Sequence, residues 1–273
     1  MTLTIPVMSF LTIFGLALLV ITGSVTLLWL ISLGLRDASI VDIFWGVGFI
    51  LLTWFYFAQT DGFQERGVLV CGLVTVWGLR LSLYILRRNW GKGEDVRYRK
   101  WREQAGGRFW WISFFKVFIV QGFLLWLISA PLLAAQFSRL PAQLTALDWL
   151  GASVWLVGFL FETIGDWQLT RFRKNPANAG GVLRSGLWGY TRHPNYFGEA
   201  TLWWGYFLIA VATPGGLWTI FSPALMTWLL VSVSGVAMLE RNLLKNKPEY
   251  LAYTQSTSAF VPWFPKGRQQ NGY

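Results

Sequence analysis

The densest set of side chains that could do chemistry lies between residues 192 and 199. Arg192, His193, Asn195 and Glu199 occur within these eight residues, and a proline follows His193. Proline is typical of a first helical turn, where free backbone N–H groups remain, and a helix beginning there places Asn195 and Glu199 on one face. With one histidine and one cysteine, the chain has too few soft ligands for a transition metal. We therefore expect a polar binding site without a metal.

A second set lies near the end of an apolar stretch that precedes this cluster. Glu162 and Asp166 are four residues apart on one face of the expected helix, and Arg173 follows two turns after Asp166. Two carboxylates one turn apart repel each other in apolar surroundings, so they need donors such as ribose hydroxyls or an arginine. Snorkelling at the helix end explains Arg171 and Lys174, but Glu162 lies too deep for it.

Two further ionisable residues lie inside apolar stretches, Asp42 and Arg80. Such residues are costly in a membrane and indicate function by default. Helical spacing places Trp77, Arg80 and Tyr84 on one face. The alternative is an Asp42–Arg80 ion pair that only holds two helices together.

Composition indicates the elements that position these residues. Apolar residues make up 54% of the 273 residues and charged residues 13%, against about a quarter in soluble domains. The polar breaks leave about seven stretches long enough to span a bilayer. They cover residues 7–33, 40–60, 66–86, 113–136, 147–169, 197–213 and 217–239. We predict an all-α polytopic membrane protein with one membrane-embedded domain, 1–273. Its N-terminal helices (1–136) form the lipid-substrate pocket, and its C-terminal part (147–265) binds the cofactor.

The basic residues predict the orientation of these helices. If the N-terminus lies outside, 19 of the 23 Lys and Arg residues fall in inner loops and the tail. This asymmetry predicts an N-out, C-in topology. The net charge of +10 is thus mostly a topology signal and not a nucleic-acid footprint, although the inner loops are basic enough to attract an anionic ligand as well.

Several enzyme classes lack their motifs in this chain. It contains no GxGxxG after a strand, no GxxxxGK[ST], no HExxH and no GxSxG. Soluble nucleotide-binding folds, zinc proteases of the HExxH type and serine hydrolases are therefore unsupported.

The segment 186–199, Gly-Leu-Trp followed by Arg-His-Pro-Asn-Tyr-Phe-Gly-Glu, resembles a known C-terminal motif. Steroid 5-alpha-reductases, sterol C14-reductases and isoprenylcysteine carboxyl methyltransferases share it. The chain most resembles a bacterial, steroid 5-alpha-reductase-like group of membrane proteins of formerly unknown function. Supporting matches are Asp166 with Arg173, Trp203 after the motif, and the tail segment 249–253.

This resemblance implies a seven-helix reductase that binds NADPH from the cytosolic side. It reduces a carbon–carbon double bond conjugated to a ketone in a steroid-like or other lipid. The residues that the resemblance places around the dinucleotide are Arg80, Asp166, Arg173, Tyr190, Asn195 and Glu199. To the same site we assign Glu162, Arg192, His193, Trp203, Arg241 and Tyr250. The cationic members suit a pyrophosphate or a 2′-phosphate, which favours NADPH over NADH.

The resemblance also implies an acid pair from the second and third spans. Asp42 falls where a Glu is expected and Trp77 where a Tyr is expected, and an indole cannot supply a proton as a phenol does. Hydride addition to an enone builds charge on the carbonyl oxygen, which a neighbouring donor stabilises. We expect Asp42 to lie in an apolar site and stay protonated at pH 7, with Trp77 or Trp45 as donor or wall. Tyr84 is the next candidate acid, and Phe49 lines the substrate pocket with Trp45.

Two other functions remain open. An S-adenosylmethionine-dependent isoprenylcysteine or lipid methyltransferase fits the same motif and the later pair Glu240–Arg241, although such enzymes commonly have fewer spans. A non-enzymatic lipid-binding or transport protein predicts inverted repeats, which the sequence lacks. As partners we expect a hydrophobic substrate and membrane lipids but no nucleic acid, in a monomer. As location we expect a bacterial inner membrane.

Overall fold

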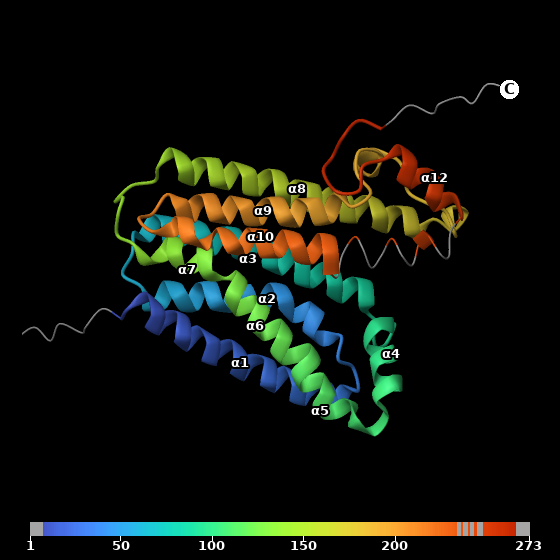
Figure 1. Cartoon of the computed structure of the whole chain (residues 1–273), viewed down its shortest axis with the longest axis horizontal. Coiled ribbons are helices and arrows are strands. Elements are labelled where there is room, and N and C mark those ends of the chain that lie inside the picture. Colours follow the sequence, from blue (N-terminus) through green and yellow to red (C-terminus); the bar gives the residue numbers. More distant parts are fainter. Residues whose placement is uncertain (1–7, 234–235, 237–239, 241–242, 245–247, 266–273) are drawn as a thin grey trace, which may run out of the picture. The chain divides into compact units, whose positions relative to one another are not determined.

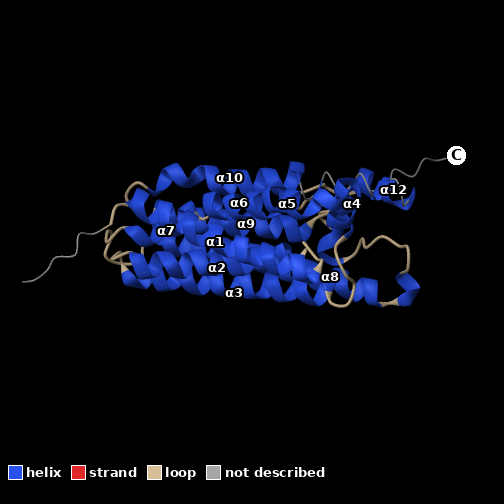
Figure 2. Ribbon diagram, turned by 90° about the horizontal axis from the view of Figure 1, so that it is seen from below, coloured by secondary structure: helices blue, strands red, loops and turns tan. Residues whose placement is uncertain are grey.

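The computed structural model describes residues 8–233, 236, 240, 243–244 and 248–265. Figures 1 and 2 show these residues as helices joined by loops, without a strand among them. The α-helices are α1 Phe10–Leu35, α2 Ile40–Gln59, α3 Gln64–Asn89, α4 Val96–Ala105, α5 Phe109–Ser113, α6 Val120–Ile128, α7 Ala130–Phe137, α8 Ala146–Lys174, α9 Pro194–Val211, α10 Phe221–Trp228 and α12 Pro248–Ser256. Short 3-10 or π segments are Gly106–Arg108, Phe114–Ile119, Pro176–Asn178, Gly186–Gly189, Gly216–Ile220 and Leu229–Val233. The predicted all-α, polytopic membrane fold is confirmed.

The chain divides into two units, each with its own internal contacts. The first unit comprises Met1–Asp148 with Ile209–Ser222, and the second comprises Trp149–Leu208 with Pro223–Tyr273. The first unit therefore contains α1 to α7, and the second contains most of α8 and α9 together with the C-terminal segments.

Six helical stretches of the described residues are long and apolar enough to cross a membrane. They are Phe10–Leu35, Ile40–Gln59, Gln64–Asn89, Val96–Phe137, Ala146–Lys174 and Gly216–Val233. The span predicted at 197–213 corresponds to α9, an 18-residue helix that is not among the six. The polar residues in its first two turns, Asn195 and Glu199, make it less apolar than the other spans. The count of seven stays a prediction, as does the N-out, C-in orientation.

Within the first unit, α2 and α3 cross at a pair of glycines. A Cβ added to Gly46 would lie 2.3 Å from the carbonyl oxygen of Gly78 and 2.7 Å from Oγ of Ser82. Small residues at such a crossing let two helix backbones touch, which is a common way to hold membrane helices together. The crossing also fixes the position of Trp77 along α3 relative to α2, because Trp77 precedes Gly78 in the chain.

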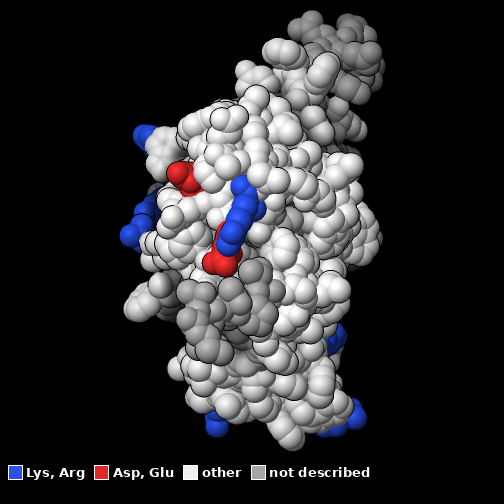
Figure 3. Space-filling view, turned by 90° about the vertical axis from the view of Figure 1, so that its left-hand side faces the viewer, with Lys and Arg blue, Asp and Glu red and all other residues white. Residues whose placement is uncertain are grey.

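A buried ion pair lies in the first unit near the start of α3. Arg66 Nε donates to Asp148 Oδ1 at 2.7 Å, and both side chains are 0% exposed. The same carboxylate accepts from the backbone N–H of Thr145 at 2.7 Å, so it also caps the first turn of α8. Arg66 further donates to the carbonyl of Gln143 at 3.0 Å. Figure 3 views this end of the molecule, where few Lys, Arg, Asp or Glu side chains are visible.

Candidate functional site

In the second unit, α8 and α9 touch backbone to backbone. A Cβ on Gly198 would lie 2.4 Å from the backbone nitrogen of Glu162, and one on Gly158 would lie 2.5 Å from that of Leu202. Gly205 repeats this contact two turns later, with its Cβ position 2.7 Å from the carbonyl oxygen of Gly151. The crossing fixes the first turns of α9 against the C-terminal half of α8.

This crossing brings together predicted site residues of α8 and α9. Asn195 Nδ2 donates to Asp166 Oδ1 at 3.0 Å. Asp166 is 3% exposed and Glu162 2% exposed, although both carry a carboxyl group. Glu199 is half-buried one turn after Asn195. The motif thus places the Asn195 amide beside the acidic face of α8, and the role of these residues in binding a cofactor stays a prediction.

Arg192 and His193 instead bind the C-terminal part of the second unit. Arg192 Nε donates to Glu240 Oε1 at 2.7 Å, and its Nη1 donates to the carbonyl of Thr254 at 3.0 Å. His193 Nε2 lies 3.3 Å from the same Glu240 oxygen, and the Tyr250 hydroxyl donates to it at 3.4 Å. Arg192 is only 8% exposed. These three predicted site residues therefore form one cluster with Glu240, and their assignment to a cofactor stays a prediction.

The cluster shifts the acid–base properties of Glu240 and Tyr250. Burial opposes ionisation of Glu240, but the hydrogen bonds from His193 and Arg192 and their positive charge outweigh it and lower the pKa of this carboxyl to about 2. Burial raises the pKa of Tyr250 to about 12, and the negative charge of Glu240 adds to this effect. Glu240 is therefore an anion throughout the physiological range.

The Glu240 cluster should make folding stability depend on pH below about 4.5. The folded pKa lies below the ordinary value of 4.5, so the stabilisation is complete above that pH and is lost as the pH falls toward about 2. In detergent, we expect Glu240→Gln to lower the thermal midpoint by roughly 2–4 °C at pH 6 and to make much less difference at pH 3. Glu249→Gln, at an exposed position in α12, is the control and should leave the difference between the two pH values as in the wild type. Identical pH curves for wild type and Glu240→Gln would contradict the pKa shift.

A second contact holds the chain after α12 against the motif. The backbone N–H of Arg192 donates to the carbonyl of Ser258 at 2.9 Å, and that of Trp263 donates to the carbonyl of Tyr190 at 3.0 Å. The Thr191 hydroxyl donates to the carbonyl of Phe260 at 2.8 Å. The chain after α12 is thus held against the motif by backbone and side-chain hydrogen bonds.

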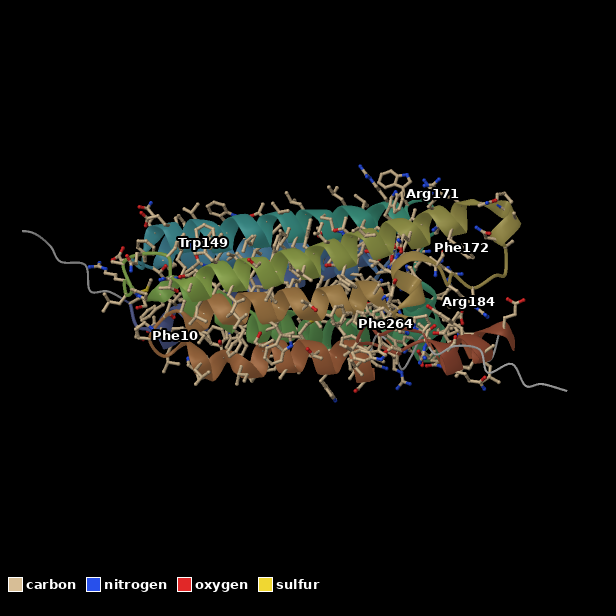
Figure 4. The ribbon with its side chains drawn as sticks, turned by 90° about the horizontal axis from the view of Figure 1, so that it is seen from above. Phe10, Trp149, Arg171, Phe172, Arg184 and Phe264 are labelled. Atoms are coloured by element: carbon tan, nitrogen blue, oxygen red, sulfur yellow. The ribbon has the colours of Figure 1, made fainter. Side chains whose placement is uncertain are left out.

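The remaining predicted residues of the second unit lie in different surroundings. Arg173 is exposed in the last turn of α8, whose end is labelled by Arg171 and Phe172 in Figure 4. Tyr190 is 45% exposed, with its ring centroid 6.1 Å from that of Phe264. Trp203 is fully buried in α9. Arg241 lies outside the described residues.

In the first unit, Asp42 lies at the centre of a polar network. Its Oδ2 accepts from Arg97 Nη2 at 2.6 Å, and its Oδ1 accepts from the Tyr98 hydroxyl at 2.6 Å. Gln121 Nε2 donates to the Tyr98 oxygen at 3.1 Å. Tyr98 is 3% exposed, so its phenol is buried against the carboxylate. The network joins the first turn of α2 to the start of α4.

The aromatic residues expected at the substrate pocket lie close together in the same unit, and their contact with a substrate stays a prediction. Trp45 and Phe49 have ring centroids 5.4 Å apart, and Phe49 and Trp77 have ring centroids 5.6 Å apart. Phe49 and Trp77 are both 0% exposed. Arg80 lies over the ring of Tyr84 at 5.3 Å, as their spacing on one helix face predicted.

The surroundings of Asp42 differ from those expected from the sequence. The expected apolar site is wrong, because the guanidinium of Arg97 lies within 2.6 Å of the carboxylate. The alternative that paired Asp42 with Arg80 is also wrong, since the ion partner of Asp42 is Arg97. Sequence reasoning missed Arg97, Tyr98 and Gln121 because the first two belong to a basic segment that was interpreted only as a cytosolic loop. The available signal was Asp95, whose side chain caps α4 by accepting from the N–H of Arg97 at 2.9 Å.

Comparison with known proteins supports the family resemblance. The model of a family described as "Protein of unknown function (DUF1295)" matches residues 28–257. Uncharacterized protein C594.04c of Schizosaccharomyces pombe is 27% identical over 280 residues, which cover 91% of this chain and 78% of the yeast protein. No solved structure is significantly similar to the chain.

A shorter similarity connects the chain with steroid reductases. The 3-oxo-5-alpha-steroid 4-dehydrogenase 1 of Bos taurus is 33% identical over 82 residues, which are 28% of this chain and 32% of the bovine protein. The Homo sapiens protein of the same name is 33% identical over 73 residues, 27% of this chain and 28% of the human one. The predicted resemblance to steroid 5-alpha-reductase-like membrane proteins is confirmed, and the partial similarity indicates a membrane reductase family. Because the family model covers most of its length, the chain belongs to the family described as "Protein of unknown function (DUF1295)".

Proposed function

We propose that this integral membrane protein is an NADPH-dependent reductase of a carbon–carbon double bond conjugated to a ketone in a steroid-like or other lipid. The observation that carries the proposal is the pairing of Asp166 with Asn195 beside the buried Glu162. Ionisable groups this well buried in a membrane protein are expensive and indicate a polar ligand. The local similarity to 3-oxo-5-alpha-steroid 4-dehydrogenase 1 supplies the reaction type.

The residues of the second unit fit a phosphate-bearing dinucleotide by the chemistry of their side chains. Asp166, Glu162 and Glu199 offer acceptors for ribose hydroxyls or a carboxamide, and Asn195 offers both an acceptor and donors. The last turn of α8 adds Arg173 as an exposed cation for a phosphate. Arg192 is already bound to Glu240, so we assign the phosphate contact to Arg173.

A bound reduced nicotinamide would supply the hydride, and this chain supplies position and a donor. Addition of hydride to the β-carbon of an enone places negative charge on its carbonyl oxygen, and a neighbouring O–H lowers that barrier. In the first unit Tyr98 carries such an O–H, which donates to the Asp42 carboxylate while Gln121 donates to the phenol oxygen; it would serve the substrate by turning from Asp42 to the carbonyl oxygen. We assign to Tyr98 the role of proton donor that the indole of Trp77 cannot fill, and to Asp42 the role of orienting the phenol. Trp45 and Phe49 wall the pocket for the apolar body of the substrate.

For the location and assembly we propose a monomer in a bacterial cytoplasmic membrane, with the cofactor site facing the cytosol. The basic loops and tail support this side, because the positive-inside rule concentrates Lys and Arg there. The same charge favours an anionic cofactor on that side.

The test of the proposal is retention of NADPH by the purified full-length protein. We expect NADPH to raise the thermal midpoint and Asn195→Ala to weaken NADPH affinity about tenfold, because a hydrogen bond to the ligand and the support of Asp166 are lost. Arg173→Ala should weaken NADPH more than NADH if it contacts the 2′-phosphate. Isothermal titration measures both affinities.

The matched control is Asn89→Ala, which removes the same amide at the end of α3 and should leave NADPH affinity unchanged. Stabilisation by S-adenosylmethionine together with none by NADPH would overturn the reductase proposal in favour of a methyltransferase.

A further inference from the structure

The C-terminal end of α8 carries a pocket on a face that the proposed cofactor site does not use. The pocket has a volume of about 320 Å³, and its lining includes Trp167, Arg171, Phe172, Asn175 and Asn178. This volume is at the lower end of the range of ligand pockets, so it suits a headgroup better than a whole dinucleotide.

Helix geometry separates this pocket from the buried carboxylates. At about 100° per residue, Trp167 and Arg171 are rotated by roughly 100° and 140° from Asp166. Asp166 is 3% exposed, whereas Trp167 is 57% exposed. The two faces of α8 therefore serve different surroundings, one inside the unit and one outside it.

Two exposed tryptophans mark where α8 leaves the apolar part of the membrane. Trp149 is 58% exposed near the start of α8, and Trp167 is 57% exposed 18 residues later. At 1.5 Å per residue they are roughly 27 Å apart along the helix, close to the hydrocarbon thickness of about 30 Å. Exposed tryptophans gather at both membrane interfaces. Figure 4 shows Trp149 near one end of the helix and Arg171 and Phe172 near the other. Arg171, one turn beyond Trp167, thus lies at the level of the lipid phosphates.

The donors at the pocket suit an anion. Arg171 lies over the ring of Trp167 at 5.6 Å, and in the described part of the chain it has no ion pair or hydrogen bond. The Oδ1 of Asn175 accepts from the N–H of Ala177 at 3.1 Å, which leaves its Nδ2 available as a donor. Among the described residues that line the pocket there is no carboxylate.

The charge around the pocket also favours an anion. From Trp167 to Gly198 the sequence contains five Lys or Arg residues and no Asp or Glu. The C-terminal end of a helix carries about half a negative charge. Three cations in the last turn, Arg171, Arg173 and Lys174, outweigh it.

We propose that this pocket binds the phosphate of an anionic phospholipid, with Arg171 and Asn175 as donors and Trp167 against the upper part of the acyl chains. An arginine fork and a phosphate make strong charge-assisted hydrogen bonds. The site is independent of the reductase proposal, because it uses neither the acidic face of α8 nor the motif at 192–199.

The experiment is a titration of delipidated full-length protein in detergent, with bound lipid counted by native mass spectrometry. The probes are short-chain phosphatidylglycerol, short-chain phosphatidylcholine and glycerol 1-phosphate. We expect one phosphatidylglycerol to bind about tenfold more tightly than phosphatidylcholine, and Arg171→Gln to remove that preference. Lys174→Gln is the matched control, since it removes one positive charge from the same turn without lining the pocket, and it should keep the preference.

Three results would overturn the proposal. Equal losses in Arg171→Gln and Lys174→Gln would show diffuse surface charge instead of a site. Equal affinity for both lipids would remove the anion preference. Binding of glycerol 1-phosphate as tight as that of phosphatidylglycerol would assign the pocket to a free phosphate. NADPH affinity is expected to be the same in Arg171→Gln as in the wild type, so a failure here leaves the proposed function untouched.

Discussion

Tyr98→Phe is expected to lower turnover of an enone lipid by about a hundredfold, at the lower end of the effect of a positioned proton donor. The phenol is buried and hydrogen-bonded to Asp42 at 2.6 Å, so the variant removes one oxygen without changing the shape of the ring. The measurement is the loss of nicotinamide absorbance in the presence of a panel of 3-oxo-4-ene steroids and other enone lipids. NADPH affinity should stay as in the wild type, because the residue belongs to the first unit.

The matched control for Tyr98 is Tyr56→Phe. Tyr56 is also a buried phenol of the first unit, and its hydroxyl lies 2.7 Å from Oγ of Ser129 instead of a carboxylate. We expect Tyr56→Phe to keep wild-type turnover. Asp42→Asn should depress turnover as well, with NADPH binding intact, because the amide can no longer hold both Arg97 and the phenol. Undiminished turnover in Tyr98→Phe would contradict this assignment and make Tyr84 the next candidate acid.

Arg66→Met is expected to destabilise the first unit by about 3–5 kcal/mol, because it leaves the carboxylate of Asp148 buried without its partner. Both side chains of the pair are 0% exposed and lie 2.7 Å apart. Cys71 provides the measurement, since it is the single cysteine of the chain and is 1% exposed in α3. A thiol-reactive dye added during a thermal ramp therefore reports opening of this unit.

The double variant Arg66→Met with Asp148→Leu should recover a large part of that loss, because replacing both charges by apolar groups removes the desolvation cost of the pair. Arg139→Gln is the control at the same end of the unit. Its ion pair with Asp61 is 3.5 Å long and both side chains are more than two-thirds exposed, so its loss should cost no more than about 1 kcal/mol. Equal midpoints for Arg66→Met and Arg139→Gln would contradict the argument.

The sequence predicts the helical membrane architecture well, because apolar stretches near 20 residues have few alternatives. The predicted ranges 40–60 and 147–169 correspond to α2 and α8. The range 197–213 is harder to identify as a span, since the polar candidate site residues in the first turns of α9 also lower its mean hydropathy. The long apolar segment 113–136 contains a π turn at Phe114–Ile119 and the break between α6 and α7, which hydropathy alone does not distinguish from a straight helix.

The candidate site is predictable where it depends on spacing along one helix and not where it depends on folding of a loop. Spacing placed Asn195 and Glu199 on one helix face, whereas Asp166 and Asn195 meet because the motif begins a helix that packs on α8, and only the family resemblance grouped those two residues. Tyr98 meets Asp42 only because a basic segment folds back as α4, and no periodicity in the sequence points at that partner. Arg192 illustrates the same limit, since its partner Glu240 lies 48 positions away.

The glycine contact between α8 and α9 has a mechanical consequence. At Gly158 and Gly198 no side chain stands between the two helices, so there is no soft layer that could shear or ratchet by one turn. The two helices should therefore translate and tilt together as one rigid body, with the spacing between Asp166 and Asn195 unchanged.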